Sequence, residues 1–171
     1  AREAGLIDQA SPNLRAGEGE IRVTVANTRM VDGLGAMRQL LHYPYGCVEQ
    51  TSSGLMPWLA AHNMREFLPE PPSAEEITKA VNIAVSRLSS MQTDAGGLGY
   101  WPGADTPDFW GSVHAARVLL MARQAEHNVP AGLIDPLLAY IKTELPGMVD
   151  DKSPWMRADR ASALHVLAMA G

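Results

Sequence analysis

The fold class of this sequence is decided by the stretch Ser73-Ala-Glu-Glu-Ile-Thr-Lys-Ala-Val-Asn-Ile-Ala-Val-Ser-Arg-Leu-Ser-Ser-Met91. Ser73 and Glu76 have the spacing of a capping box, in which each side chain accepts a hydrogen bond from the other residue's backbone N–H. The apolar residues that follow recur every three or four positions, as on the buried face of a helix. These apolar residues are Ile77, Ala80, Val81, Ala84, Val85, Leu88 and Met91. The stretch therefore predicts an amphipathic α-helix.

Outward from this helix, most of the chain consists of apolar helical patterns separated by Gly and Pro residues. Proline marks several of the expected starts. Pro57 is expected to start or kink the helix in which it lies, and Thr106-Pro107 has the pattern of a cap followed by a first turn. Further helices are expected over 33–43, 52–67 and 108–127, from Asp135-Pro136 onward, and from Ser153-Pro154 to the end of the chain at Gly171.

Helices joined by short loops predict an all-α class of consecutive antiparallel pairs. The Gly-rich loop at 94–103 suggests hairpins arranged as an α/α toroid. Residues 20–26 alternate apolar and polar side chains and predict one strand, whose partners we expect outside this chain. We therefore divide the chain into residues 1–32, a loop and strand, and residues 33–171, a helical domain whose last helix we expect to be cut short.

Composition excludes several function classes. The chain of 171 residues carries a net charge of −5 without a basic cluster, which argues against binding to nucleic acid or anionic membranes. No apolar run reaches the roughly 18 residues that span a bilayer. The start, Ala1 to Gly5, lacks Met and a signal pattern, so we expect a mature or internal segment. The single cysteine excludes an internal disulfide and a cysteine-rich zinc site.

That cysteine lies in the chemically most informative stretch, Tyr43-Pro-Tyr-Gly-Cys-Val-Glu-Gln-Thr51. Cys47 comes just before an expected helix, where the positive end of the macrodipole favours a thiolate. Gln50 follows three residues later, so one helical turn would bring its side-chain carbonyl near the sulfur. From composition alone, the alternative is that Cys47 is a small buried hydrophobe and Gln50 an ordinary cap residue.

The motif Pro44-Tyr-Gly-Cys-Val-Glu-Gln50 resembles the thioester motif of the alpha-2-macroglobulin and complement family, Pro-Tyr-Gly-Cys-Gly-Glu-Gln. It differs at Val48, where vertebrate members have Gly and bacterial members tolerate a branched apolar residue. Pro57, the Gly-rich loop at 92–101 and the helix that opens at Trp110 also resemble the family, so the likeness runs from about residue 20 to at least 145. It identifies the sequence as part of a bacterial thioester domain, and residues 1–32 as belonging to a flanking β-domain.

This resemblance implies that the Cys47 sulfur condenses with the Gln50 carboxamide, releases ammonia and leaves an internal thioester. A lysine amine of an attacking peptidase then displaces the sulfur and becomes joined to Gln50. Such a trap is a single-use peptidase inhibitor rather than an enzyme. Motif residues expected to support it are Pro44, Tyr45, Gly46 and Glu49, and possible shielding residues are Tyr43, Met56 and Trp58.

The shielding residues have an equally good explanation as core side chains, and Glu49 either orients the site or is a solvated first-turn carboxylate. None of the five histidines matches the role that a histidine plays in some family members, so no catalytic residue is assigned. No cofactor or metal is predicted. The expected partners are target peptidases and the remaining domains of the parent protein, and the expected location is the periplasm or cell envelope.

Three other functions stay open. The first is a cysteine peptidase or acyltransferase with Cys47 as nucleophile and a histidine as base. The second is an α/α-toroid enzyme or binding module of the prenyltransferase or terpene cyclase type, suggested by the Gln-x-x-x-Gly-Gly loop at Gln92. The third is a purely structural helical domain. An intact thioester would leave Cys47 unreactive until methylamine is added, whereas a catalytic thiolate would alkylate at once.

Overall fold

Helices make up the fold of residues 46–63, 71–148 and 153–171, which are the residues that the computed structural model describes. Within these ranges the only β-type pairing is an isolated bridge between Gln92 and Leu98, which confirms the all-α class. The predicted strand at 20–26, the predicted helix at 33–43 and the boundary after residue 32 lie outside the described residues. The helices are α3 (Val48–Asn63), α4 (Ala74–Ser89), α5 (Phe109–Gln124), α6 (Ala131–Glu144), the short 3-10 helix η3 (Leu145–Met148) and α7 (Pro154–Ala170).

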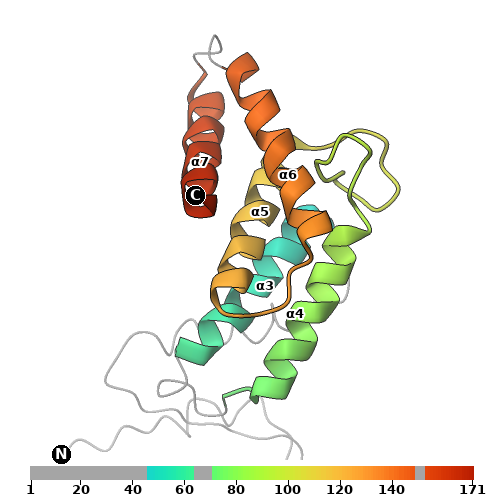
Figure 1. Cartoon of the computed structure of the whole chain (residues 1–171), viewed down its shortest axis with the longest axis vertical. Coiled ribbons are helices and arrows are strands. Elements are labelled where there is room, and N and C mark those ends of the chain that lie inside the picture. The colour runs from blue at the N-terminus through green and yellow to red at the C-terminus, as the bar shows by residue number, and fades with distance from the viewer. Residues whose placement is uncertain (1–45, 64–70, 149–152) are drawn as a thin grey trace, which may run out of the picture.

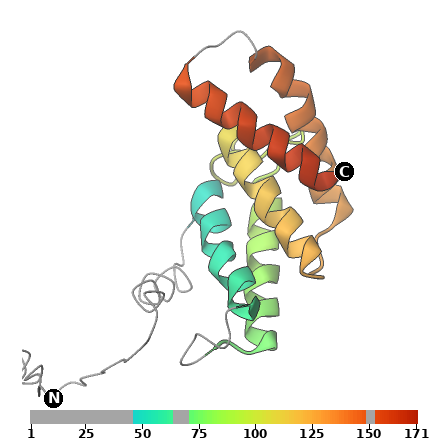
Figure 2. The ribbon, with the colours of Figure 1, turned by 90° about the vertical axis from the view of Figure 1, so that its left-hand side faces the viewer.

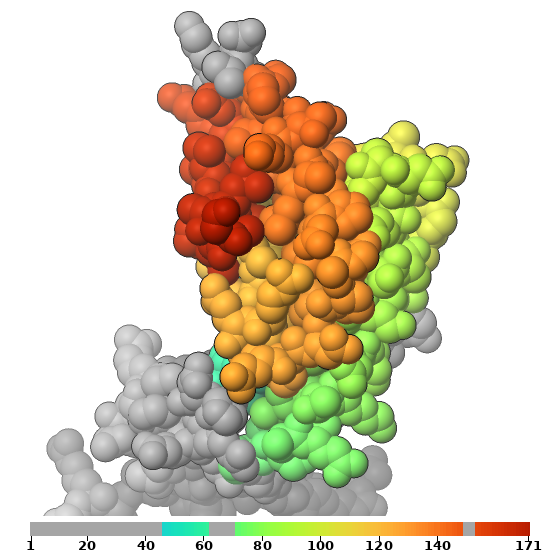
Figure 3. Space-filling model, in the orientation of Figure 1, coloured from blue at the N-terminus to red at the C-terminus, as the bar shows by residue number. Residues whose placement is uncertain are grey.

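The five α-helices alternate in direction and form two layers. α3, α5 and α7 run one way and pack side by side, with α5 between the other two (Figures 1 and 2). α4 packs on α3 and α6 packs on α5, both running the opposite way behind the first layer (Figure 2). On the face seen in Figure 3, the surface comes mainly from α4, α6 and α7, and little of α3 is visible. This alternation confirms the antiparallel pairing of consecutive helices, while closure into a toroid stays a prediction.

α5 is the central helix, which explains its lack of a single apolar stripe. Nine of its sixteen residues are buried, on all sides of the helix, because α3, α6 and α7 each cover a part of it. One continuous apolar core joins all five α-helices. None of the helices in the described ranges is long and apolar enough to cross a membrane.

The capping box of α4 is confirmed. The Ser73 backbone N–H donates to Glu76 Oε2 at 2.7 Å, and the Glu76 N–H donates to Ser73 Oγ at 3.1 Å. The predicted stripe faces the core, with Ala80 half-buried and the other members buried. Ser153 caps α7 as predicted, because its Oγ accepts from the Met156 N–H at 3.2 Å.

Two predicted helix starts that relied on proline are wrong. α5 has Asp108 as its N-cap rather than Thr106, because Asp108 Oδ1 accepts from the Gly111 N–H at 2.6 Å. The Asp108 N–H also donates to the Leu98 carbonyl at 2.8 Å, which keeps Thr106 and Pro107 in the loop. That helix ends at Gln124, not at His127.

α6 begins at Ala131 and contains Pro136, although Asp135-Pro136 was expected to start it. An interior proline costs about 3 kcal/mol. The extra upstream turn buries Leu133 and Ile134, and full burial of such side chains contributes about 1.5–3 kcal/mol each. Burial therefore outweighs the missing backbone hydrogen bond.

The Gly-rich loop between α4 and α5 is held by packing against α6. Gly96 has φ +87°, and a Cβ placed there would lie 2.6 Å from the Pro136 carbonyl oxygen, so only glycine fits. The Gln92 side-chain amide donates to the carbonyls of Gly96 at 3.0 Å and of Leu133 at 2.9 Å. The Gln-x-x-x-Gly-Gly pattern, which suggested a cyclase-type module, thus has a structural role in this loop.

Candidate reactive site at the start of α3

Cys47 and Gln50 lie together at the first turn of α3. The helix begins at Val48 rather than near Ser52 as predicted, because the Cys47 carbonyl already accepts the Thr51 N–H at 3.0 Å. The Cys47 backbone N–H donates to Gln50 Oε1 at 3.2 Å. Cys47 is buried, with 2% of its surface exposed, and Gln50 is half-buried. The structure therefore places the glutamine carboxamide against the residue that carries the thiol.

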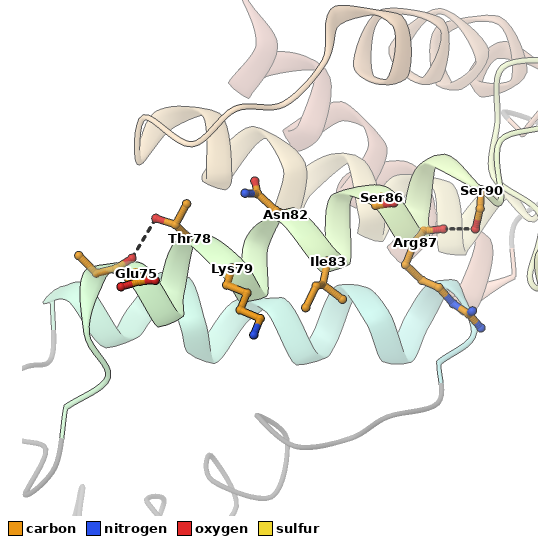
Figure 4. Close-up of a pocket in the computed structure, with 9 residues that line it drawn as sticks. Glu75, Thr78, Lys79, Asn82, Ile83, Ser86, Arg87 and Ser90 are labelled. Carbon is orange, nitrogen blue, oxygen red and sulfur yellow. Dashed lines mark hydrogen bonds between the residues drawn. The ribbon is translucent and has the colours of Figure 1, made fainter.

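Glycine at residue 46 lets the chain pass very close to the first turn of α3. A Cβ at this position would lie 2.6 Å from Thr51 Oγ1 and 3.2 Å from the Thr51 backbone nitrogen. The Gly46 carbonyl accepts a hydrogen bond of 3.1 Å from Nη2 of Arg87 in the last turn of α4. Figure 4 shows Arg87 extending from α4 toward the start of α3. The sequence motif alone gives no sign of this anchor.

The packing of Val48 against α5 explains how the motif tolerates a branched side chain after the cysteine. The Val48 side chain is fully buried against Gly111 in the first turn of α5. A Cβ on Gly111 would come within 2.4 Å of Val48 Cγ1, which no ordinary contact allows. The absence of a side chain at residue 111 thus makes the space that Val48 fills.

Tyr100, in the Gly-rich loop, contacts the motif through its backbone, because its carbonyl accepts the Val48 N–H at 3.0 Å. Side-chain hydrogen bonding with Cys47, followed by the negative charge of the thiolate, raises the pKa of Tyr100. Burial and the carboxylates of Glu49 and Asp108 act in the same direction. The loop resembled the family in sequence, but nothing in that likeness indicated that Tyr100 reaches the motif.

Glu49 belongs to a chain of polar groups that links α3 to α5. Ser53 Oγ donates to Glu49 Oε1 at 2.9 Å and lies 3.0 Å from His114 Nε2. Because the single hydroxyl proton of Ser53 goes to Glu49, Nε2 of His114 acts as the donor to Ser53. Glu49 is half-buried rather than fully solvated, and an orienting role for it stays a prediction.

His114 is the histidine that belongs to this polar chain, although no sequence pattern selected it. Burial lowers the pKa of His114, the charge of Arg117 lowers it further, and the Glu49 carboxylate opposes both. The ring stacks on Trp110 with centroids 5.4 Å apart. His114 and Trp110 also line a cavity of about 310 Å³ between α5 and α7. Asp159 and His165 of α7 line the same cavity.

Two of the predicted shielding residues, Met56 and Trp58, do not lie at the sulfur. Met56 and Trp58 lie more than two turns along α3 from Cys47, roughly 13 Å or more at 1.5 Å per residue, and pack partly buried against the core. Their positions agree with the core-filling alternative. Tyr43, Pro44 and Tyr45 lie outside the described residues. The broad open hollow along the exposed face of α4, shown in Figure 4, contains neither Cys47 nor Gln50.

Comparison with known proteins places this arrangement in a family. No family model matches the chain. It is 34% identical over 119 residues to the alpha-2-macroglobulin of Escherichia coli K12, a match that covers 66% of this chain and 7% of that protein. The fold is similar to that of Salmonella alpha-2-macroglobulin reacted with methylamine, with a TM-score of 0.68, 32% identity, and coverage of 80% of this chain and 10% of that one.

The chain belongs to the bacterial alpha-2-macroglobulin family. Trypsin-activated alpha-2-macroglobulin from Escherichia coli is similar as well, with a TM-score of 0.64, 29% identity, and coverage of 75% of this chain and 9% of that one. The chain spans only about 7% of the length of the curated alpha-2-macroglobulin that it matches.

Proposed function

We propose that Cys47 and Gln50 form an internal thioester, and that the protein containing this segment uses it to capture peptidases covalently. One observation carries the proposal: Gln50 Oε1 lies 3.2 Å from the backbone nitrogen of the buried Cys47, at the start of α3. Membership of the alpha-2-macroglobulin family, whose members are protease inhibitors, supports the inhibitory function. The motif Pro44-Tyr-Gly-Cys-Val-Glu-Gln50 supports the chemistry.

Formation of the thioester joins Cys47 Sγ to Gln50 Cδ. The sulfur attacks the carboxamide carbon, the C–N bond breaks, and the nitrogen leaves as ammonia with the thiol proton. In the observed geometry, the Cys47 N–H already donates to the oxygen that stays on the acyl carbon. A donor so placed stabilises the negative charge that develops on this oxygen when a nucleophile attacks.

Capture reverses the role of the Cys47 sulfur, which is the nucleophile when the thioester forms and the leaving group when an amine attacks it. An amine attacks Gln50 Cδ, the C–S bond breaks, and the proton lost by nitrogen balances the one that the sulfur takes up. Sulfur leaves readily because an ordinary thiol has a pKa of about 8.5, against about 10.4 for a lysine ammonium. Gln50 ends as an amide of the attacking protein, and Cys47 is free. The reaction consumes the site, so one molecule captures one target without turnover.

The named relatives suggest what attacks the bond. The Salmonella relative has been reacted with methylamine, a small amine, and an Escherichia coli relative is activated by trypsin. We infer that peptidases are the partners of this protein and that their lysine amines are captured. The likeness to the family also supports action in the periplasm or cell envelope, and shielding of the bond from water by the other domains of the parent protein.

The decisive experiment measures mass and free thiol in the full-length protein. The wild-type protein should be lighter than its encoded chain by one ammonia, and methylamine should release one thiol and add one methylamine at Gln50. Cys47→Ala and Gln50→Asn serve as matched controls, because each removes one partner of the bond. Full encoded mass together with a freely reactive thiol in the folded, full-length protein would overturn the proposal.

The same samples separate the trap from a cysteine enzyme. A catalytic thiolate would alkylate before methylamine is added and would turn over substrate repeatedly. The trap should instead inhibit an added peptidase in a fixed ratio, with a covalent adduct mapped to Gln50. Repeated turnover without an adduct would favour the enzyme.

A further inference from the structure

A broad hollow of about 940 Å³ runs along one side of α4, with Ile83 near its middle (Figure 4). The described residues that line it all belong to α4 and to its C-cap, Ser90. The Ile83 side chain is 61% exposed, although the apolar stripe of the same helix is buried in the core. One exposed isoleucine needs no explanation by itself. Its place beside the point at which the upstream chain arrives suggests what covers it.

The upstream chain arrives at one end of this α4 hollow. Arg87, which lines the hollow, donates from Nη2 to the Gly46 carbonyl at 3.1 Å, and Gly46 is the first described residue. Figure 4 shows Ile83 and Arg87 projecting from the same side of α4. Because consecutive residues span at most about 3.6 Å each, residue 43 has to lie within roughly 11 Å of Gly46. The segment that ends at residue 43 is therefore tethered beside the hollow.

The predicted helix at 33–43, which lies outside the described residues, fits the α4 hollow in pattern and length. Met37, Leu40 and Leu41 have the three- and four-residue spacing of one apolar helix face. Eleven helical residues extend about 16 Å, and the sixteen residues of α4 extend about 24 Å. A helix this short is stable only when its apolar face is packed. It therefore needs a surface such as the one around Ile83.

The alternation of helix directions gives the segment its orientation. α3 packs antiparallel to α4, and a helix that leads into α3 through a short turn runs antiparallel to α3. The segment would therefore run in the direction of α4 and end near Arg87. Along a helix axis, Leu40 lies about 4.5 Å from residue 43, and Ile83 lies about 6 Å from Arg87. The apolar face of the segment thus comes level with Ile83.

We propose that residues 33–43 form a helix that docks in the α4 hollow, with Leu40 and Leu41 against Ile83. Docking would hold the chain on both sides of Cys47, because α3 already fixes the residues that follow it. The docking does not depend on a thioester, but its consequence does and rests on the function proposed above. A motif held at both ends should exclude water better and so prolong the life of the bond.

The first test is a disulfide between the two surfaces in the full-length protein. Ile83→Cys is combined with Leu40→Cys or with Leu41→Cys in a Cys47→Ala background, which has no thioester. Under mild oxidation at least one pair should form the bond, which requires Cα atoms within about 7 Å. In the control, Thr143→Cys, exposed on α6, replaces Ile83→Cys. If neither pair forms a disulfide, or if the control forms one equally well, the docking is wrong.

The second test is hydrogen exchange in Ile83→Asp, which places a charge in the α4 hollow. Amide exchange over residues 33–43 should become about tenfold faster or more, because the docked face loses its apolar partner. Leu164→Asp is the matched control, since Leu164 is also an exposed apolar residue but lies on α7. Unchanged exchange in Ile83→Asp, or an equal change in both variants, would overturn the docking.

The same two variants test the consequence for the thioester, followed by free thiol and intact mass. Ile83→Asp should lose the bond to water about threefold faster or more, and Leu164→Asp at the wild-type rate. Faster exchange with an unchanged rate of thioester loss would overturn the protective role and leave the docking standing. A wild-type protein with full encoded mass would overturn the thioester function, whereas the disulfide test would still decide the docking.

Discussion

Nη2 of Arg87 lies 3.1 Å from the carbonyl oxygen of Gly46 and donates a hydrogen bond to it, which joins the last turn of α4 to the residue before Cys47. Replacing Arg87 by Met keeps most of the unbranched apolar stem of the side chain and removes the donor. Because Arg87 is largely exposed, we expect the free energy of unfolding to fall by only about 1 kcal/mol. Urea unfolding measures this loss.

The control for Arg87 is Arg123→Met, which removes an exposed arginine from the last turn of α5. Hydrogen exchange at the Cys47 and Gln50 amides should become faster in Arg87→Met only. Equal effects of the two substitutions on that exchange would show that Arg87 does not anchor the motif.

Gly96 and Gly103 both have positive φ, but only Gly96 is crowded. A Cβ at Gly96 would lie 2.6 Å from the Pro136 oxygen, whereas nothing lies within 4 Å of a Cβ at Gly103. Gly103→Ala should cost about 1–2 kcal/mol from the backbone alone. Gly96→Ala should cost roughly 1–3 kcal/mol more, because α6 must shift. Thermal unfolding of the two variants side by side tests this, and similar losses would contradict the close approach to α6.

The depressed pKa of His114 predicts that the fold loses stability in mild acid. The unfolded chain takes up the His114 proton near its ordinary pKa of about 6.5, and the folded chain takes it up only at lower pH. Unfolding therefore binds a proton in this window, so stability contributed by neutral His114 is present above about pH 6.5 and declines as the pH falls below it.

The measurement for His114 is urea unfolding at pH 7.5 and at pH 5.5. The change between the two should be smaller in His114→Gln, whose amide can still donate to Ser53 but does not titrate. His127→Gln is the control, since that residue lies beyond the end of α5. An unaltered pH dependence in His114→Gln would rule out this histidine as the source.

The contact between Val48 and Gly111 predicts strong coupling between two substitutions. Gly111→Ala places a methyl group within 2.4 Å of Val48 Cγ1 and should cost about 1–3 kcal/mol as overpacking. The same substitution made in a Val48→Gly background should cost less, because the obstructing methyl group is gone and only the contact with Asp108 Oδ1 at 2.9 Å remains. A double-mutant cycle on the free energy of unfolding measures the difference, and additive losses would show that the two residues do not compete for space.

The sequence predicted those parts of the structure that depend on near neighbours. The Ser73–Glu76 capping box is an interaction over three residues, and so is the approach of Gln50 to Cys47. Proline was misleading at Pro136, because burial of Leu133 and Ile134 against helices distant in sequence outweighs a local cost. A local sequence pattern does not show how deeply a side chain is buried, because the helices that bury it are distant in the sequence.

The parts of the site that were missed come from far along the chain. Arg87 lies 41 residues from Gly46 in the sequence. Tyr100 lies in the loop between α4 and α5, and Gly111 lies in the first turn of α5. Because α3, α4 and α5 alternate in direction, this loop and this turn lie at the same end of the fold as the start of α3. Each contributes one contact that has no signature within its own stretch of sequence. Only the fold shows that they surround Cys47.

The fully buried Val48 occupies the space that Gly111 leaves empty, and this has a consequence for how such sequences change over time. We expect the residue after the cysteine and the residue at the position of Gly111, in the first turn of α5, to vary together. A relative with glycine after its cysteine has more room at the position of Gly111 than a relative with a branched residue after its cysteine. Two positions far apart in the sequence would then be coupled through the volume that they share.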